Sequence, residues 1–142
     1  PALENVSNNH LMLGHFMDWF YSGLGGISQS KTSVAYKEVV IKPEMVGDLT
    51  WVKTSYQSPY GEIRSDWIKS GTKIKMTISI PANSTALVYI PFSKGSVIKE
   101  GGKDISTVKE IEVIAEENGR KVVQIGSGVY EFESLISNPT PK

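Results

Sequence analysis

Lys73-Ile74-Lys75-Met76-Thr77-Ile78-Ser79-Ile80 is the stretch that decides the fold of this chain. Its apolar residues (Ile74, Met76, Ile78 and Ile80) alternate strictly with polar ones. Successive residues of a strand point to opposite faces of the sheet, so this pattern predicts a strand with one face in a core and the other in water. Ser70-Gly71 precedes the stretch and Pro81-Ala82-Asn83-Ser84 follows it, as expected for a strand between tight turns.

Comparable segments lie on both sides of this strand. Further strands are expected at 39–41, 49–56, 62–68, 85–90, 108–115, 121–125 and 129–133, with at most a short one at 97–98. Asn118-Gly119 is the strongest hairpin signal in the chain. Eight or so short strands, each bounded by glycine, proline or asparagine, are typical of an antiparallel sandwich or barrel. We therefore expect a mainly β protein, with an antiparallel sandwich and a barrel both open at this point.

The segment before the strands has a helical period instead. Apolar residues recur at three- and four-residue steps (Leu13, Phe16 or Met17, Phe20, Leu24), which predicts a helix from 8 to about 25 that ends in a glycine cluster. Other apolar residues (Leu11, Met12, Trp19) lie off that face, so the helix should be buried on more than one side. One small β domain covers only one side. We expect the helix to pack against something outside this chain, with a polar connector over 28–33.

Composition excludes several classes of function. The 142 residues carry fifteen basic and fifteen acidic side chains, so no electrostatic footprint indicates a nucleic acid or an anionic membrane. No apolar run approaches the roughly 20 residues of a membrane span. The absence of cysteine excludes disulfides and thiolate chemistry but leaves the compartment open between cytoplasmic and periplasmic or secreted. The start at Pro1 without a methionine indicates processing, trimming or excision, which agrees with the expectation of a chain cut out of something larger.

Several short motifs follow one another along the chain. They are Asn9-His10 with Gly14, Asp18-Trp19-Phe20-Tyr21, Gly25-Gly26-Ile27, Tyr36 with Ile41-Lys42-Pro43, Leu49-Thr50-Trp51, Ser55-Tyr56-Gln57-Ser58-Pro59-Tyr60-Gly61 with Ser65 and Trp67, and the stretches 80–86 and 125–132. In sequence and order they resemble the C-terminal end of bacterial α-L-rhamnosidases, glycoside hydrolase family 78. The resemblance extends over nearly the whole chain, although the stretch 93–107 is longer and more basic than the family pattern.

The resemblance implies two parts. Residues 1–30 would be the last helix of a truncated (α/α)6 catalytic barrel, and residues 31–142 an antiparallel, jelly-roll-like β-sandwich packed beside it. Such enzymes invert the anomeric carbon with one carboxylic acid and one carboxylate, set far enough apart to admit a water. By this alignment both lie before Pro1, so no catalytic residue is expected here. His10, flanked by Asn9, is expected to point into the sugar pocket and to hydrogen-bond rhamnose hydroxyls.

His10 also suits that role chemically. An imidazole at a helix start tends to stay neutral, and it can then both donate and accept a hydrogen bond. The alternative is a capping or surface histidine, which the resemblance makes the weaker hypothesis. His15 is off register and is expected to be a packing or surface residue. Glu4 precedes His10 closely, but one carboxylate cannot supply both acid and base, so it is assigned no catalysis.

Other candidates have simpler interpretations. The acidic pairs Glu62/Asp66 and Glu116/Glu117 are expected to be solvated. The four aromatic residues of the first strands (Trp51, Tyr56, Tyr60, Trp67) suit either a sugar-stacking platform or packing, and we favour packing for Trp51 and Trp67. Asn5-Val6-Ser7 and Asn83-Ser84-Thr85 match the glycosylation pattern but are better explained as a helix cap and a turn. No cofactor or metal is expected.

The sequence thus favours the C-terminal fragment of an inverting α-L-rhamnosidase that hydrolyses terminal α-L-rhamnosyl residues. The fragment would support the barrel and supply His10, and it would be inactive alone. The expected partners are the upstream barrel and, through it, L-rhamnosides. The alternative is a stand-alone β-sandwich module, either carbohydrate-binding or purely structural. Without a barrel, the apolar helix should fold back on the sandwich or form a homodimer.

Overall fold

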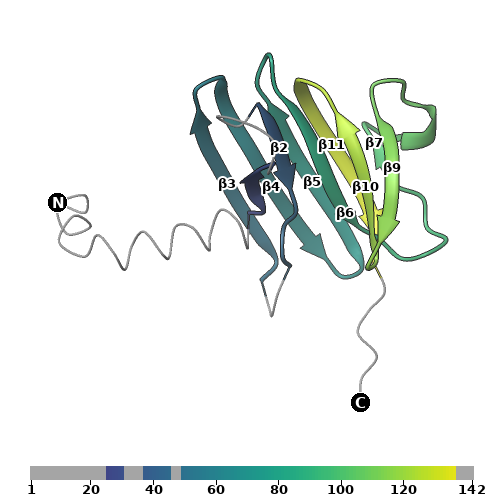
Figure 1. Ribbon diagram of the computed structural model, residues 1–142. Helices are drawn as coiled ribbons and strands as arrows, with labels where there is room; N and C mark the ends of the chain where they lie inside the picture. The colour runs from purple at the N-terminus through teal and green to yellow at the C-terminus, as the bar shows by residue number, and fades with distance from the viewer. Residues whose placement is uncertain (1–24, 31–36, 46–48, 137–142) are drawn as a thin grey trace, which may run out of the picture.

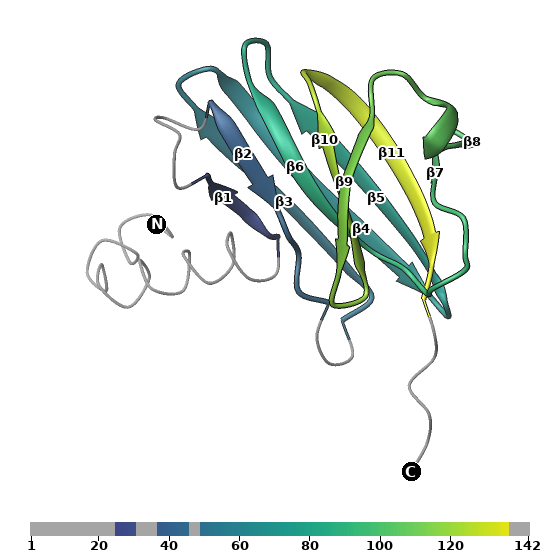
Figure 2. The ribbon, with the colours of Figure 1, turned by 45° about the vertical axis from the view of Figure 1, so that its right-hand side comes forward.

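The computed structural model describes residues 25–30, 37–45 and 49–136, which form two facing β-sheets (Figure 1, Figure 2). One sheet has the strand order β1-β2-β6-β10-β9 and the other β3-β4-β5-β11-β7-β8. The strands are β1 (Ile27–Gln29), β2 (Glu38–Ile41), β3 (Trp51–Ser58), β4 (Gly61–Ser70), β5 (Lys73–Ile80), β6 (Thr85–Pro91), β7 (Lys99–Glu100), β8 (Lys103–Asp104), β9 (Glu112–Glu117), β10 (Arg120–Ile125) and β11 (Gly128–Leu135). The expected mainly β sandwich is confirmed.

Strand β5, the strictly alternating stretch Lys73–Ile80, lies between β4 and β11. Its apolar residues all face the interior, and its register sets Met76 opposite Trp67 of β4 and Phe132 of β11. All three side chains are completely buried. They belong to one continuous core between the two sheets, to which the other sheet contributes Val39, Ile41, Val88, Ile90, Val123 and Ile125. Burial of large apolar side chains at this density is the main stabilising term of such a fold.

One strand pair runs against the expectation of a purely antiparallel sandwich. β2 and β6 are parallel neighbours, with Ile41 opposite Val88. The three strands β3, β4 and β5, which lie between them in the sequence, belong to the opposite sheet. The chain therefore leaves one sheet after β2 and returns beside it at β6. Apolar alternation indicates which side chains face the core but not the direction of the neighbouring strand, so this parallel pair could not be predicted from it.

Three local expectations were wrong in detail. The stretch from Ser28 was expected to be a connector, but Ile27–Gln29 forms β1 and pairs with β2. The strand expected over 108–115 begins only at Glu112, because a single turn of 3-10 helix occupies Ile105–Thr107. The Asp104 carboxylate accepts the backbone N–H of Ser106 at 2.9 Å and so caps that turn. The short strand expected at 97–98 is shifted to β7, which pairs with β8.

The expected Asn118-Gly119 hairpin is confirmed, and it joins β9 to β10. Both residues have positive φ (50° and 74°), as a two-residue hairpin turn of this type requires. Apart from Gly25, the expected helix over 8–25 lies outside the described residues. Within the described part, no helix has the length and apolar character needed to cross a membrane.

Candidate functional site

The residues expected to touch substrate lie outside the described part of the chain. These residues are His10 and Asn9. Glu4 and His15, for which no contact with substrate is expected, also lie outside the described part. The structure begins at Gly25, where the segment that contains them enters the sandwich. The candidate site that the structure does describe is therefore this entry point, formed by Gly25 and Gly26.

Gly25 is enclosed between the two sheets. Its carbonyl oxygen accepts a hydrogen bond from the Ser65 hydroxyl of β4 at 2.7 Å, and Ser65 is completely buried. A Cβ added at Gly25 would come within 2.6 Å of both Cβ and Cγ2 of Thr54 on β3. Real Cβ atoms do not approach other heavy atoms this closely, so the position accepts only glycine without rearrangement. The entry point is thus held by a buried hydrogen bond and by close packing at once.

Gly26 fixes the next step of the chain. Its φ is +75°, a conformation that glycine adopts without the steric cost of a side chain. A Cβ there would also meet the backbone between Lys42 and Pro43. The carbonyl oxygen of Gly26 accepts the backbone N–H of Lys42 at 2.8 Å and so begins the pairing of β1 with β2. The two glycines therefore attach the preceding segment to both sheets, Gly25 to β3 and β4 and Gly26 to the end of β2.

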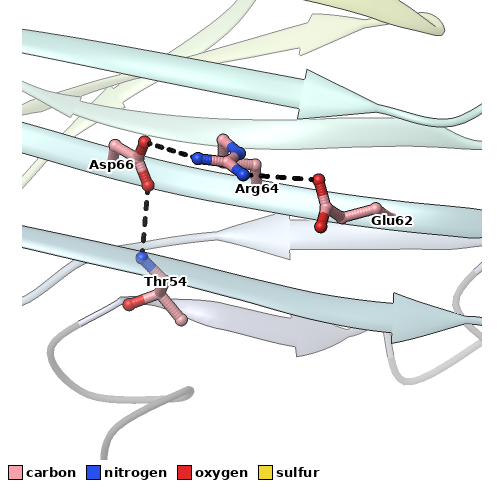
Figure 3. Close-up of polar contacts among 4 residues, drawn as sticks. All are labelled: Thr54, Glu62, Arg64 and Asp66. Atoms are coloured by element: carbon pink, nitrogen blue, oxygen red, sulfur yellow. Dashed lines mark hydrogen bonds and ion pairs between the residues drawn. The ribbon is translucent and has the colours of Figure 1, made fainter.

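Thr54 has an unusual environment at this junction. Its side chain is 3% exposed, and its Oγ1 has no hydrogen-bond partner among the described residues. A buried hydroxyl without a partner costs about 1–3 kcal/mol. Its backbone N–H is satisfied by Asp66 Oδ1 at 3.2 Å (Figure 3). Thr54 is therefore held in place by its backbone, and its side chain is the surface on which Gly25 packs.

The acidic pair Glu62/Asp66 belongs to a chain of contacts along β4. Arg64 lies between the two, with Nη2 at 3.5 Å from Glu62 Oε1 and Nη1 at 3.4 Å from Asp66 Oδ2 (Figure 3). Both the Arg64 and the Glu62 side chain are about half exposed, so these ion pairs contribute little to stability. Asp66 has a further role, because its other carboxylate oxygen, Oδ1, accepts a hydrogen bond from the backbone N–H of Thr54. The pair is structural, and Glu116 and Glu117 are exposed on β9.

The four aromatic residues of the first hairpin do not form one platform. Trp67 is completely buried, as expected for packing. Trp51 is 59% exposed, so it does not pack in the core of the described residues, and its packing at an interface with another domain stays a prediction. It shares a face of β3 with Lys53 and Ser55, and this parity was visible in the sequence. Tyr60 is exposed in the turn at the opposite end of the hairpin, about 20 Å along the strand from Trp51.

The structure describes one of the two segments that match the glycosylation pattern. Asn83 has a φ of 67°, and the next backbone N–H, from the buried Ser84, donates to Pro81 at 3.2 Å. The turn interpretation of Asn83-Ser84-Thr85 is therefore confirmed, while Asn5-Val6-Ser7 lies outside the described residues. Among the described residues no group of three or more histidine, aspartate or glutamate side chains is arranged to hold a metal ion.

Comparisons with known proteins relate this architecture to one family. Residues 26–104 match the model of the bacterial α-L-rhamnosidase C-terminal domain. An α-L-rhamnosidase of Formosa agariphila is 31% identical over 133 residues, which are 92% of this chain and 14% of that protein. A second relative, the α-L-rhamnosidase of Streptomyces avermitilis, is 27% identical over 129 residues, or 91% of this chain and 12% of that protein. The chain thus spans about one seventh of the length of the relatives that it matches.

Solved structures agree with the sequence comparison. The crystal structure of a Streptomyces avermitilis α-L-rhamnosidase complexed with L-rhamnose superimposes with a TM-score of 0.70 at 26% identity, covering 81% of this chain and 10% of that one. An α-L-rhamnosidase from Dictyoglumus thermophilum gives a TM-score of 0.68 at 32% identity, covering 81% and 13%. The family model covers more than half of the chain, and the fold agrees with it. The chain therefore belongs to the family of bacterial α-L-rhamnosidase C-terminal domains.

Proposed function

We propose that this chain is the C-terminal part of a larger, inverting α-L-rhamnosidase, and that its sandwich holds the last helix of the catalytic barrel in place. Residues 1–30 contribute that helix and residues 31–142 the accessory domain. In this arrangement His10 and Asn9 reach the rhamnose pocket, and the catalytic acid and base come from the upstream barrel. The observation that carries the proposal is the buried junction of Gly25 and Gly26, which follows the segment containing His10 in the sequence and contacts one sheet through Gly25 and the other through Gly26.

The surface beside this junction supports the same role. Trp51 and Ile68 are register partners on β3 and β4, and their side chains are 59% and 50% exposed. Leu49 precedes Trp51 by two residues and is 38% exposed. Exposed apolar side chains that gather in one place mark contact surfaces. The patch lies on the outer face of β3 and β4, whose inner face carries the contacts of Gly25, and we assign it to contact with the upstream barrel.

An activity assay tests the assignment of the catalytic residues. The purified 142-residue chain should release no aryl alcohol from an aryl α-L-rhamnoside, because the proposal places both carboxylates of the reaction outside it. Glu4→Gln is the matched control, since Glu4 is the acidic residue nearest to His10 on its N-terminal side. Release of aryl alcohol at a rate that Glu4→Gln abolishes would overturn the proposal.

The stand-alone carbohydrate-binding module remains the second candidate, and the exposure of Trp51 is the observation in its favour. Rhamnose or pectic oligosaccharides would then quench tryptophan fluorescence saturably, and Trp51→Ala would remove the effect. Quenching that persists in Trp51→Ala, or no quenching at all, would count against a sugar site on this face. The purely structural module predicts no response in either assay.

A further inference from the structure

A polar hollow lies on the outer face of the sheet that contains β2, β6 and β10 (the sheet is seen in Figure 2), and its lining residue Lys42 is the one whose backbone N–H donates to Gly26. Its volume is about 230 Å³. It is lined by Lys42, Glu44, Tyr89, Glu117, Asn118 and Arg120. These residues come from three separate parts of the chain: the segment after β2, the middle of β6, and the hairpin between β9 and β10. Neither the proposed function nor the family comparison assigns them a role.

The floor of the hollow is set by strand pairing. Val88 and Ile90 of β6 are buried in the core, so Tyr89 between them faces outward. The parallel register of Ile41 with Val88 brings Lys42 beside Tyr89, and Lys42 Nζ lies 5.0 Å from the centroid of the Tyr89 ring. A cation at this distance is attracted to the face of the ring.

The wall of the hollow is held by Arg120. Its Nη2 donates to the carbonyl oxygen of Pro43 at 3.2 Å and to Glu44 Oε2 at 3.1 Å. The Arg120 side chain is only 17% exposed, so this contact is better shielded from water than an ordinary surface ion pair. Glu117 is the register partner of Arg120 across the hairpin. The β9–β10 hairpin and the segment after β2 are therefore tied together around a preformed space.

The lining has the composition that a neutral, hydroxyl-rich ligand requires. Two cations (Lys42, Arg120) and two carboxylates (Glu44, Glu117) cancel in charge, so neither an anionic nor a cationic ligand is favoured. Carboxylates accept, cations donate, and the Asn118 amide does both, which matches hydroxyls that both donate and accept. The Tyr89 ring offers an apolar surface among these polar groups. We propose that this hollow binds a single neutral sugar residue.

The inference does not depend on the proposed function, and it is tested on the 142-residue chain itself. Methyl α-L-rhamnopyranoside and methyl β-D-glucopyranoside are titrated into isotope-labelled protein while amide chemical shifts are recorded. Glucuronate and glucosamine serve as charged comparators. Saturable shifts should be confined to the lining residues, with a dissociation constant on the order of millimolar for so small a ligand. The two charged sugars should bind more weakly than the neutral ones.

Two neighbouring glutamates supply a matched pair of variants. Glu117 lines the hollow. Glu116 is exposed, does not line the hollow, and is the register partner of Lys121 on β10. Glu117→Gln should weaken binding at least about tenfold, since hydrogen bonds to charged groups are the stronger ones. Glu116→Gln should leave binding unchanged. If the amide spectrum shows that Glu117→Gln perturbs the hairpin, Lys42→Gln on the opposite side of the hollow takes its place.

The proposal is overturned by any of four results. One is the absence of shifts at sugar concentrations about tenfold above the expected dissociation constant. Another is a set of shifts centred elsewhere, for instance around Trp51. The third is equal binding of charged and neutral sugars. The fourth is equal loss of binding in Glu117→Gln and Glu116→Gln. None of these outcomes bears on the aryl rhamnoside assay, so failure here is separate from failure of the proposed function.

Discussion

Gly25→Ala is the substitution whose effect the structure determines most directly. The new Cβ would lie within 2.6 Å of two carbon atoms of Thr54, one of which is the Thr54 Cβ attached to the β3 backbone. Relief therefore requires movement of β3 or of Gly25 rather than a change of rotamer. Movement of Gly25 would also remove the acceptor of the buried Ser65 hydroxyl. Overpacking together with a lost buried hydrogen bond predicts destabilisation of about 2–4 kcal/mol.

The chain offers a matched control for this substitution. Gly126, like Gly25, does not have a positive φ, but no atom lies within 4 Å of a Cβ added there. Gly126→Ala should therefore be neutral or stabilising by up to about 1 kcal/mol, because it restricts the unfolded chain. At about 4 °C per kcal/mol for a domain of this size, Gly25→Ala should lower Tm by about 8–16 °C.

Thermal unfolding followed by circular dichroism provides the measurement, with urea titration as a second estimate of the free energy of unfolding. Adding Thr54→Ala to Gly25→Ala removes two of the three crowding atoms, Oγ1 and Cγ2, so part of the lost stability should return. The interaction energy of the double-mutant cycle should then be clearly favourable. If Gly25→Ala and Gly126→Ala have the same Tm within about 2 °C, Gly25 is not held as described and the reasoning is refuted.

Four further predictions follow from the same structure. Thr54→Val should stabilise the chain by about 1 kcal/mol in urea titration, because it replaces an unpartnered buried hydroxyl with a methyl group; a loss of stability would mean that Oγ1 has a partner outside the described residues. Burial raises the pKa of Tyr130 above 10.0, so the folded state holds this proton more tightly and stability should fall as pH rises above about 10; Tyr130→Phe should reduce that fall, and an unchanged alkaline profile would contradict it. Trp67→Ala should cost about 3–5 kcal/mol, whereas Trp51→Ala should change the free energy of unfolding by no more than about 0.5 kcal/mol, and similar losses would show that Trp51 is not exposed. Light scattering should find either a dimer or a monomer in which residues 1–24 are protected from protease, and a monomer cleaved rapidly there would contradict both expected arrangements.

Apolar alternation was sufficient to predict most of the sandwich. It correctly assigned β5 and its neighbours, since a strand with one buried face allows only one parity of its apolar residues. Asn118 and Gly119 also identified their hairpin correctly, because the turn requires their conformational freedom. The same parity rule, applied to β3, would have placed Trp51 with Lys53 and Ser55 on the outer face. The residue type of Trp51 indicated packing but did not distinguish the core from an interface, whereas its position excludes the core.

Features formed by distant segments were not accessible from sequence. The parallel pairing of β2 with β6 depends on three intervening strands of the other sheet, and the local sequence pattern does not predict it. The polar hollow depends on that pairing and on Arg120, which contacts Pro43 across 77 residues of sequence. Ser65 and Gly25 are likewise 40 residues apart. In each case the contact joins residues that are far apart in the sequence, and only the topology brings them together.

The central claim is that this sandwich works as part of a much longer rhamnosidase polypeptide. The most direct test is the mass of the native polypeptide in its source cells, detected with an antibody raised against this chain. Since the chain spans 14% of the length of its relatives, the account predicts a band about seven times heavier than the 15.6 kDa of this chain. A band at 15.6 kDa itself would contradict it and would make sugar binding by the isolated sandwich the leading hypothesis.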